Sequence, residues 1–438
     1  MQEKNGAEKS RGWYRLDNSA AVYPAIQRDD YSAIYRFSAV MKKRVDPALL
    51  QRAVDLTMPR FPVFNVCIKK GVFWYYLEPN LKPGPFVKPD IANPCMPVRF
   101  REDNGYLLRI YFYEKRISVE MYHALTDGAG AMVFLKTLLA EYLRLQGYEI
   151  PCTLGVKDVA APPEEEEAED AYIRYATSET PRGMKEDKAY PGLGTRAPFY
   201  TLNVISGLVS LDELRLTAKS YGASITEYLS AVLIRVLLDK QKREQPHRLR
   251  PVALAVPIDL RRFFPSDTLR NFILNVCPAV NPGMGEYTFE EIVRQVHHYM
   301  RLNLSRQYLR AKMTGNVRLR FNPFVSRIPL VMKNPLLYIN YQRMGNRQYS
   351  ATLTNPGVFR VPAAMREHIQ RAEMMLGQSF AARANCGCIS FGNTMAITFA
   401  GSIVEPDVER EFFRRLVRDG IHVRVESNRE EGNGCHTA

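Results

Sequence analysis

The residues best suited to chemistry lie between positions 117 and 130, where His123 is followed by Asp127, Gly128 and Gly130. A free imidazole has a pKa of about 6.5, so a neutral histidine can accept a proton at cellular pH. The glycines allow the backbone to turn sharply and to approach a bound group closely. These residue types predict a general-base site at His123, with Asp127 and Gly128 beside it.

The surrounding sequence predicts the elements that must position this histidine. Apolar and polar residues alternate over 117–122, which is the two-residue period of a half-buried strand, and the period puts His123 on the apolar face. After Gly130, apolar residues recur at helical spacing over 132–143, and Gly147 suits the C-terminal end of that helix. His123 is therefore predicted at the junction of a strand and a helix.

The sequence also allows other interpretations of His123 and Asp127. A single histidine at the end of a strand is more often a packed core residue than a catalytic group. His123 and Asp127 have the spacing of two metal ligands, but no third ligand is evident nearby, so we expect no metal. A nucleophile elbow, a phosphate-binding loop and a zinc-protease motif are all missing from the sequence.

Length, composition and charge limit the class of protein. The 438 residues are 46% hydrophobic and 24% charged, which is ordinary for a globular chain and enough for two cores. No apolar run approaches the roughly 18 residues of a membrane helix, and residues 1–11 lack the apolar core of a secretion signal, so we expect a cytoplasmic protein with no transmembrane segment. The net charge of +14 includes a basic cluster over 301–320, but no nucleic-acid-reading motif accompanies it, and we expect no nucleic-acid partner.

Hairpins and helices alternate in both halves of the chain, which predicts an α+β fold. Helices are predicted between Asp46 and Pro59, after the caps Ser210 and Ser224, and over 288–312 and 407–418. Strands are predicted over 33–41, 63–69, 72–77, 107–114, 117–122, 200–209, 252–258, 351–353, 372–376, 386–391, 396–402 and 423–426. A segment rich in proline, glycine and glutamate, residues 151–199, is predicted to be a solvated linker between an N-terminal subdomain, 1–150, and a C-terminal subdomain, 200–438.

The residues 123–128 resemble the HxxxDG signature of the chloramphenicol-acetyltransferase-like superfamily, which includes condensation domains and alcohol acetyltransferases. The opening stretches 13–17, 60–62 and 73–76 are similar to those of bacterial alcohol-acetyltransferase-like proteins. Residues 257–261 with 271–272 resemble the arginine and asparagine motifs of the family's channel, and residues 354–357 resemble its (S/T)NxG motif. The resemblance spans about residues 13–428, in the right order along the chain.

The resemblance implies two acetyltransferase-like subdomains, each a mixed sheet with helices, that meet at a central tunnel. His123 would be the general base there, Asp127 would pair with Arg261, and Gly128 would form the turn and offer an N–H to the developing oxyanion. Asn271, Thr354 and Asn355 would support or line the channel. No cofactor is expected to stay bound, because the acyl donor, an acyl-CoA or another phosphopantetheine thioester, is a substrate, and the acceptor is a small alcohol or amine.

Departures from the family patterns leave alternatives. Tyr122 stands where condensation domains have a first histidine, and the DFGWG motif of the plant enzymes is missing. No carrier domain is apparent in the chain, so the donor is expected to be free acyl-CoA or a thioester on a separate acyl carrier protein. A stand-alone condensation-type protein is thus one alternative. A member of the fold that binds a small molecule without turnover is another.

Overall fold

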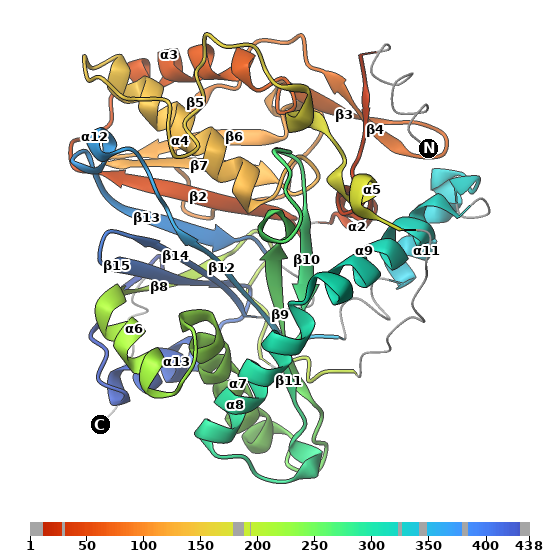
Figure 1. The fold of residues 1–438 in the computed structure, drawn as a ribbon, viewed down its shortest axis with the longest axis vertical. Helices are drawn as coiled ribbons and strands as arrows, with labels where there is room; N and C mark the ends of the chain where they lie inside the picture. The colour runs from red at the N-terminus through yellow and green to blue at the C-terminus, as the bar shows by residue number, and fades with distance from the viewer. Residues whose placement is uncertain are drawn as a thin grey trace.

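The computed structural model describes residues 12–28, 31–177, 188–192, 194–322, 326–340, 348–378 and 384–429. Helices lie outside two large sheets that face each other in the middle of the molecule, so the predicted α+β class is confirmed (Figure 1). Each half has its own hydrophobic core.

The N-terminal half is built on a five-stranded sheet in the order β13-β2-β7-β6-β5. Its strands are β2 (Ile34–Met41), β5 (Val87–Pro89), β6 (Leu108–Tyr113), β7 (Arg116–Tyr122) and β13 (Ile369–Leu376). The helices α3 (Pro47–Thr57) and α4 (Gly128–Arg144) cover its outer face (Figure 1). Asp46 caps α3 by accepting the N–H groups of Ala48 and Leu49, as the sequence predicts.

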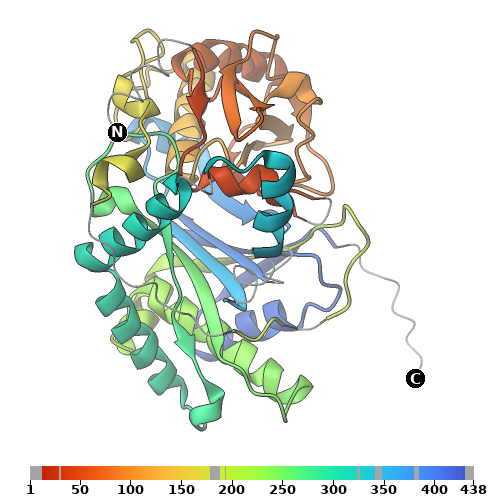
Figure 2. The same ribbon diagram turned by 90° about the vertical axis from the view of Figure 1, so that its right-hand side faces the viewer.

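A smaller sheet, β1-β4-β3, flanks this half and is formed by β1 (Tyr14–Arg15), β3 (Val66–Lys70) and β4 (Tyr75–Pro79). The predicted hairpin is present, with shorter strands than expected. A short helix, α2 (Tyr23–Ile26), follows β1. Beside α2 lies α11 (Leu330–Asn340), which comes from the other half of the chain (Figure 2).

The C-terminal half is built on an eight-stranded sheet in the order β10-β9-β12-β14-β15-β8-β16, with β11 also paired to β9. Its helices α6, α7, α8 and α13 pack on one another and on the sheet face turned away from the N-terminal half (Figure 1). The strands are β8 (Asn203–Ser210), β9 (Val252–Asp259), β10 (Ile273–Val276), β11 (Ala279–Val280), β12 (Ala351–Val358), β14 (Asn385–Phe391), β15 (Thr394–Gly401) and β16 (Val423–Ser427). The helices are α6 (Leu211–Ser220), α7 (Ile225–Glu244), α8 (Phe289–Asn303), α9 (Arg306–Phe321), α12 (Ala363–Arg366) and α13 (Asp407–Arg418).

One strand of the C-terminal half of the sequence belongs to the N-terminal sheet. β13 runs antiparallel to β2, and the two strands pair from Leu376 with Tyr35 to Ile369 with Met41. β13 also packs against β14 of the other sheet, because Gly387 has no side chain there: a Cβ would lie 2.9 Å from the carbonyl oxygen of Met374. The two halves are therefore joined by an exchanged strand as well as by the connecting segment.

The prediction of a solvated linker over 151–199 is wrong at Glu167, Ala171 and Tyr172, which are buried. Glu167 is buried and forms ion pairs with Arg60 and Lys157, both at 2.7 Å. The helix α5 (Ala171–Tyr175) buries Tyr172, whose hydroxyl donates to the carbonyl of Ile273 at 2.7 Å. Residues 167–172 therefore connect the two halves, because Glu167 is paired with Arg60 and Tyr172 is packed against β10.

The predicted helix over 288–312 is also interrupted. α8 ends at Asn303, and α9 begins at Arg306 after Ser305, whose hydroxyl accepts the N–H of Tyr308. A serine cap in the middle of an apolar pattern provides the physical reason for the break. Within the described residues, no single helix is both long and apolar enough to cross a membrane, and only α6 and α7 together, bent by 77°, satisfy length and hydropathy.

Candidate active site

A cavity of about 480 Å³ lies between the two halves and is lined by residues of both. His123 and Gly128 line it from the N-terminal half, and Thr354 and Asn355 line it from the C-terminal half. Ligand pockets usually have volumes of roughly 300 to 1,000 Å³, so this cavity is large enough for a small molecule or part of one. Asp127, Arg261 and Asn271 are not among its lining residues and lie behind its wall.

His123 follows directly after β7, and its ring is held between aromatic side chains. The ring stacks on Tyr23, with centroids 4.9 Å apart and an angle of 18° between the planes, and it packs edge-on against Tyr35, also at 4.9 Å. Burial lowers the pKa of His123, although the hydrogen bond to Asn271 and the charge of Asp127 oppose the shift. The imidazole is therefore neutral at cellular pH and fixed in orientation.

A chain of hydrogen bonds connects His123 to a buried carboxylate. Nδ1 of His123 lies 3.1 Å from Oδ1 of Asn271, and Nδ2 of Asn271 donates to Oδ2 of Asp17 at 2.9 Å. Because the Asn271 oxygen can only accept, Nδ1 carries the proton and Nε2 is the basic nitrogen. Burial raises the pKa of Asp17 to about 6, against the opposing charge of Arg270.

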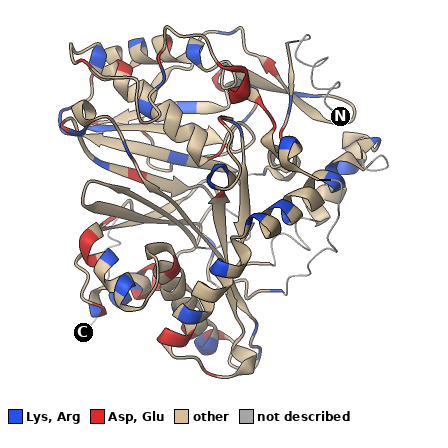
Figure 3. Ribbon diagram, viewed as in Figure 1, with Lys and Arg blue, Asp and Glu red and all other residues tan. Residues whose placement is uncertain are grey.

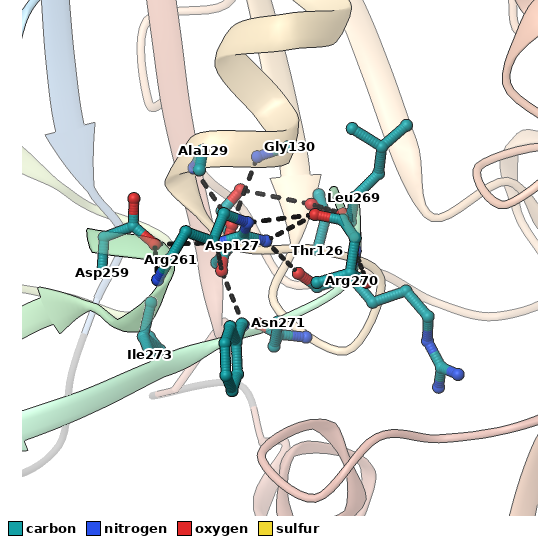
Figure 4. Close-up of polar contacts among 12 residues, drawn as sticks. Thr126, Asp127, Ala129, Gly130, Asp259, Arg261, Leu269, Arg270, Asn271 and Ile273 are labelled. Atoms are coloured by element: carbon teal, nitrogen blue, oxygen red, sulfur yellow. Dashed lines mark hydrogen bonds and ion pairs between the residues drawn. The ribbon is translucent and has the colours of Figure 1, made fainter. Parts of the chain in front are cut away.

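Asp127 begins α4 and binds groups from both halves of the chain (Figure 4). Its Oδ1 accepts the N–H groups of Ala129 and Gly130, which are otherwise unpaired at a helix N-terminus. Its Oδ2 accepts from Nη1 of Arg261 at 2.8 Å and from the backbone N–H of Phe272 at 2.7 Å. The expected contact between Asp127 and Arg261 is present, and the side chain of Asp127 is fully buried.

Arg261 follows the end of β9 and holds the segment 268–271 in place. Its guanidinium also pairs with Asp259 at 3.0 Å and donates to the carbonyl groups of Thr268 and Arg270. Burial alone would lower the pKa of Arg261, but the charges of Asp127 and Asp259 outweigh it, so the pKa is raised above its usual value. The segment it holds carries Asn271, so Arg261 helps to position the partner of His123.

Gly130 is required by the close packing of α4 on this segment. A Cβ at Gly130 would collide with the carbonyl oxygen of Leu269 and with the hydroxyl of Thr126. That hydroxyl donates to the same carbonyl at 2.6 Å. Gly130, two residues after the motif, thus allows the two halves to meet beside His123.

Thr354 and Asn355 lie in β12 and line the cavity from the C-terminal half. The pairing of β12 with β14 is irregular between Thr354 and Gly357. Asn355 donates to the hydroxyl of Thr226 at 3.1 Å and accepts the N–H of Gly357 at 3.0 Å, so its side chain shapes the wall locally. The structure thus brings every predicted site residue to the cavity or directly behind it.

Sequence reasoning did not assign roles to Asp17, Tyr23 or Tyr35. Asp17 lies 254 residues from Asn271 in the chain, and nothing in its local pattern indicates that contact. Tyr23 and Tyr35 are aromatic residues in short apolar stretches, which is the usual pattern of core residues. The one available signal was that residues 13–17 belong to the stretches that resemble the family.

Comparison with solved structures identifies the fold. The chain has the fold of solved condensation domains and acetyltransferases, over nearly its whole length. The chain is similar to polyketide synthase associated protein 5 from Mycobacterium tuberculosis, with a TM-score of 0.58 and 14% identity over 92% of this chain and 97% of that one.

Two further structures show the same fold. A complex of TRI101 from F. graminearum with coenzyme A and deoxynivalenol has a TM-score of 0.61 at 10% identity, covering 94% of this chain and 99% of that one. The starter condensation domain of rhizomide synthetase RzmA with C8-CoA has a TM-score of 0.58 at 13% identity, covering 94% and 95%. No protein-family model matches the sequence, and comparison with curated proteins returns no match.

Proposed function

We propose that this protein is an acyltransferase that moves an acyl group from an acyl-CoA thioester to an alcohol or amine, with His123 as the general base. The observation that carries the proposal is the state of His123. Its ring is neutral, lines a cavity between the two halves, and is held by Asn271 through Nδ1 so that Nε2 is free to take a proton.

The reaction follows from these contacts. Nε2 of His123 takes the proton of the acceptor O–H or N–H as the oxygen or nitrogen attacks the thioester carbonyl. The C–S bond then breaks, and the thiolate receives the proton from the imidazolium, so the histidine is regenerated and no acyl-enzyme forms. The chain from Asn271 to Asp17 stabilises the ring in the required tautomer and orientation.

Gly128 and the residues of β12 supply the polar contacts in this proposal. Gly128 lines the cavity at the start of α4, where backbone N–H groups and the helix dipole favour negative charge. Thr354 lines the cavity from β12. Asp127 and Arg261 hold the turn and the Asn271 segment in place and do not touch the reacting groups.

The basic residues near α8 and α9 favour a phosphorylated donor. Met300 of α8, Leu304 between α8 and α9, and Arg262 after β9 all line the cavity. Arg306 and Arg310 lie over the ring of Phe264, at 5.7 and 5.6 Å from its centroid, and basic residues continue along α9 (Figure 3). A CoA phosphate placed there would be attracted by these charges, whereas a neutral acyl chain extends into the cavity.

Proteins of similar fold bind CoA, a CoA thioester and other small molecules. The solved structures include complexes with C8-CoA, with Leu-SNAC and with coenzyme A and deoxynivalenol. These ligands support a small acceptor and a CoA thioester for this chain too. Tyr122 stands where condensation domains have a first histidine, and α9 is basic. Both features favour free acyl-CoA over a separate acyl carrier protein as the donor.

The test is a donor and acceptor screen with the purified protein. Acetyl-CoA, octanoyl-CoA and an octanoylated acyl carrier protein are each incubated with a panel of alcohols and amines, and free thiol and acylated product are measured by absorbance and mass spectrometry. We expect thiol release that requires both acyl-CoA and an acceptor. Release only from the carrier would indicate the condensation-type alternative, and binding of acyl-CoA without acceptor-dependent release would indicate a non-catalytic member and contradict the proposal.

A further inference from the structure

The outer side of α11 and the neighbouring hairpin tip form an exposed apolar surface. Four side chains of α11 are between 45% and 75% exposed: Val331, Met332, Leu336 and Ile339. The tip between β3 and β4 adds residues 72–74, among which Val72 is 67% exposed and Trp74 is 40% exposed. We call these seven residues the α11–hairpin face.

The face is continuous because the hairpin tip and α11 are joined through their backbones. The N–H of Leu330 donates to the carbonyl of Val72 at 2.8 Å. Nζ of Lys333 donates to the carbonyl of Phe73, also at 2.8 Å. The aromatic tip therefore lies at the N-terminal end of the helix and extends its apolar surface.

α11 has the reverse of the usual arrangement for a surface helix, in which polar residues face water. Its polar side chains are turned toward the protein: besides Lys333, Nδ2 of Asn334 donates to the hydroxyl of Tyr75 at 2.8 Å, and the hydroxyl of Tyr338 accepts from Arg28 at 2.6 Å. A helix turns by about 100° per residue, so positions 331, 332, 336 and 339 share one side. The apolar side faces outward, and a surface of this kind calls for an apolar environment.

The charges around the face are predominantly basic. Lys69, Lys70 and Arg327 are exposed beside the hairpin and before α11, and Lys69 pairs with Glu78 at 3.6 Å. Residues 330–340 of α11 include no acidic residue, and the whole chain carries a net charge of +14. Two copies of such a face would repel each other, whereas an anionic surface would be attracted.

We propose that the α11–hairpin face docks on the surface of an anionic membrane. The outward apolar side chains would enter the boundary between headgroups and acyl chains, with Phe73 and Trp74 at the level that aromatic side chains prefer. Lys69, Lys70 and Arg327 would contact the lipid phosphates. This is interfacial binding by one face of the protein, and it does not depend on the acyltransferase activity.

The docked face adjoins the helix that carries an active-site aromatic residue. Arg28, which follows α2, packs over the ring of Tyr338 at 5.0 Å, and Tyr23 of α2 stacks on His123. A protein held by α11 would therefore keep this wall of the cavity next to the bilayer, where apolar substrates are concentrated.

The test is flotation of the full-length protein with lipid vesicles. Vesicles of phosphatidylcholine alone are compared with vesicles in which about one third of the lipid is phosphatidylglycerol, at low and high salt. We expect binding to the anionic vesicles that salt weakens. The double variant M332D/L336D should bind at least about ten-fold more weakly than the wild type, because both positions face outward and lose their apolar contact with the lipid.

A matched control separates docking from a general effect of surface charge. L216D/L302D places the same charges at residues that are 72% and 74% exposed on α6 and α8, and it should bind vesicles like the wild type. Circular dichroism checks that all variants are folded. Equal loss in both double variants, or no vesicle binding by the wild type, would overturn the proposal, as would a dimer in sedimentation velocity that only M332D/L336D dissociates, since the face would then bind a second copy.

Discussion

Replacing Asp127 by asparagine should destabilise the protein strongly while changing its shape very little. The asparagine oxygen can keep the helix cap at Ala129 and Gly130, but its NH₂ group then faces two donors, Nη1 of Arg261 and the N–H of Phe272. If the amide turns the other way, the cap is lost instead. Either orientation leaves buried donors without a partner.

The size of the effect follows from these contacts. Removing one partner of a buried ion pair costs about 3 to 5 kcal/mol, and an orphaned buried N–H costs about 1 to 3 kcal/mol. Arg261 keeps Asp259 and two carbonyl groups as partners, which reduces the cost of losing the ion pair with Asp127. We therefore expect Asp127→Asn to lower the free energy of unfolding by about 3 to 5 kcal/mol in total.

The assay is guanidinium unfolding followed by circular dichroism. The control is Arg215→Ala, which removes an exposed ion pair with Asp212 and should change the free energy by no more than about 0.5 kcal/mol. A double-mutant cycle with Arg261→Met should give a coupling energy of about 2 kcal/mol or more, because the two groups are in direct contact. A loss below about 1 kcal/mol for Asp127→Asn would refute the reasoning that this carboxylate joins the halves.

Further predictions concern the same site. Gly130→Ala should lower the free energy of unfolding by about 2 kcal/mol or more, since the new Cβ collides with the carbonyl of Leu269, and the thermal midpoint would report it. Asp17→Asn should lower kcat about ten-fold with a smaller change in KM, because the Asn271 amide then loses its charged acceptor and is held only by the carbonyl of His123; equal kcat would contradict the role of that chain. Burial lowers the pKa of His123, so the imidazole should stay neutral, and kcat/KM should stay constant, until the pH drops below about 6.5. The acid side of a profile of kcat/KM against pH measures this.

The local elements could be predicted because their patterns are local. The alternation before His123 gives β7, the caps at Asp46 and Ser224 begin α3 and α7, and each is present in the structure. The break at Ser305 was missed although a capping residue marks it, because apolar residues continue at helical spacing on both sides. Period alone does not separate one long helix from two.

Contacts between distant segments could not be predicted in this way. Nothing in the pattern of 369–376 tells which sheet the strand joins, because either sheet offers an apolar face. The charge of Glu167 suggested a solvated linker, and only Arg60 and Lys157 make its burial favourable. Asp17 likewise could not be assigned to the site, because its partner Asn271 is distant in the sequence.

The candidate site was predicted from the resemblance and a few residue types. His123, Asp127 and Arg261 lie as that resemblance implies, with Asp127 bound to Arg261 rather than to the histidine. The aromatic cage of Tyr23 and Tyr35 and the tautomer set by Asn271 emerge only from the geometry. These contacts bury the imidazole, which lowers its pKa, and they fix the orientation of its ring.

The most direct measurement of the central claim compares wild type with His123→Ala and His123→Gln in acceptor-dependent thiol release from acyl-CoA. General-base catalysis contributes roughly two to four decades of rate, so both variants should lose at least about a hundred-fold in kcat and still bind acyl-CoA in calorimetry. Turnover at the wild-type rate by either variant would contradict the assignment of His123 as the base.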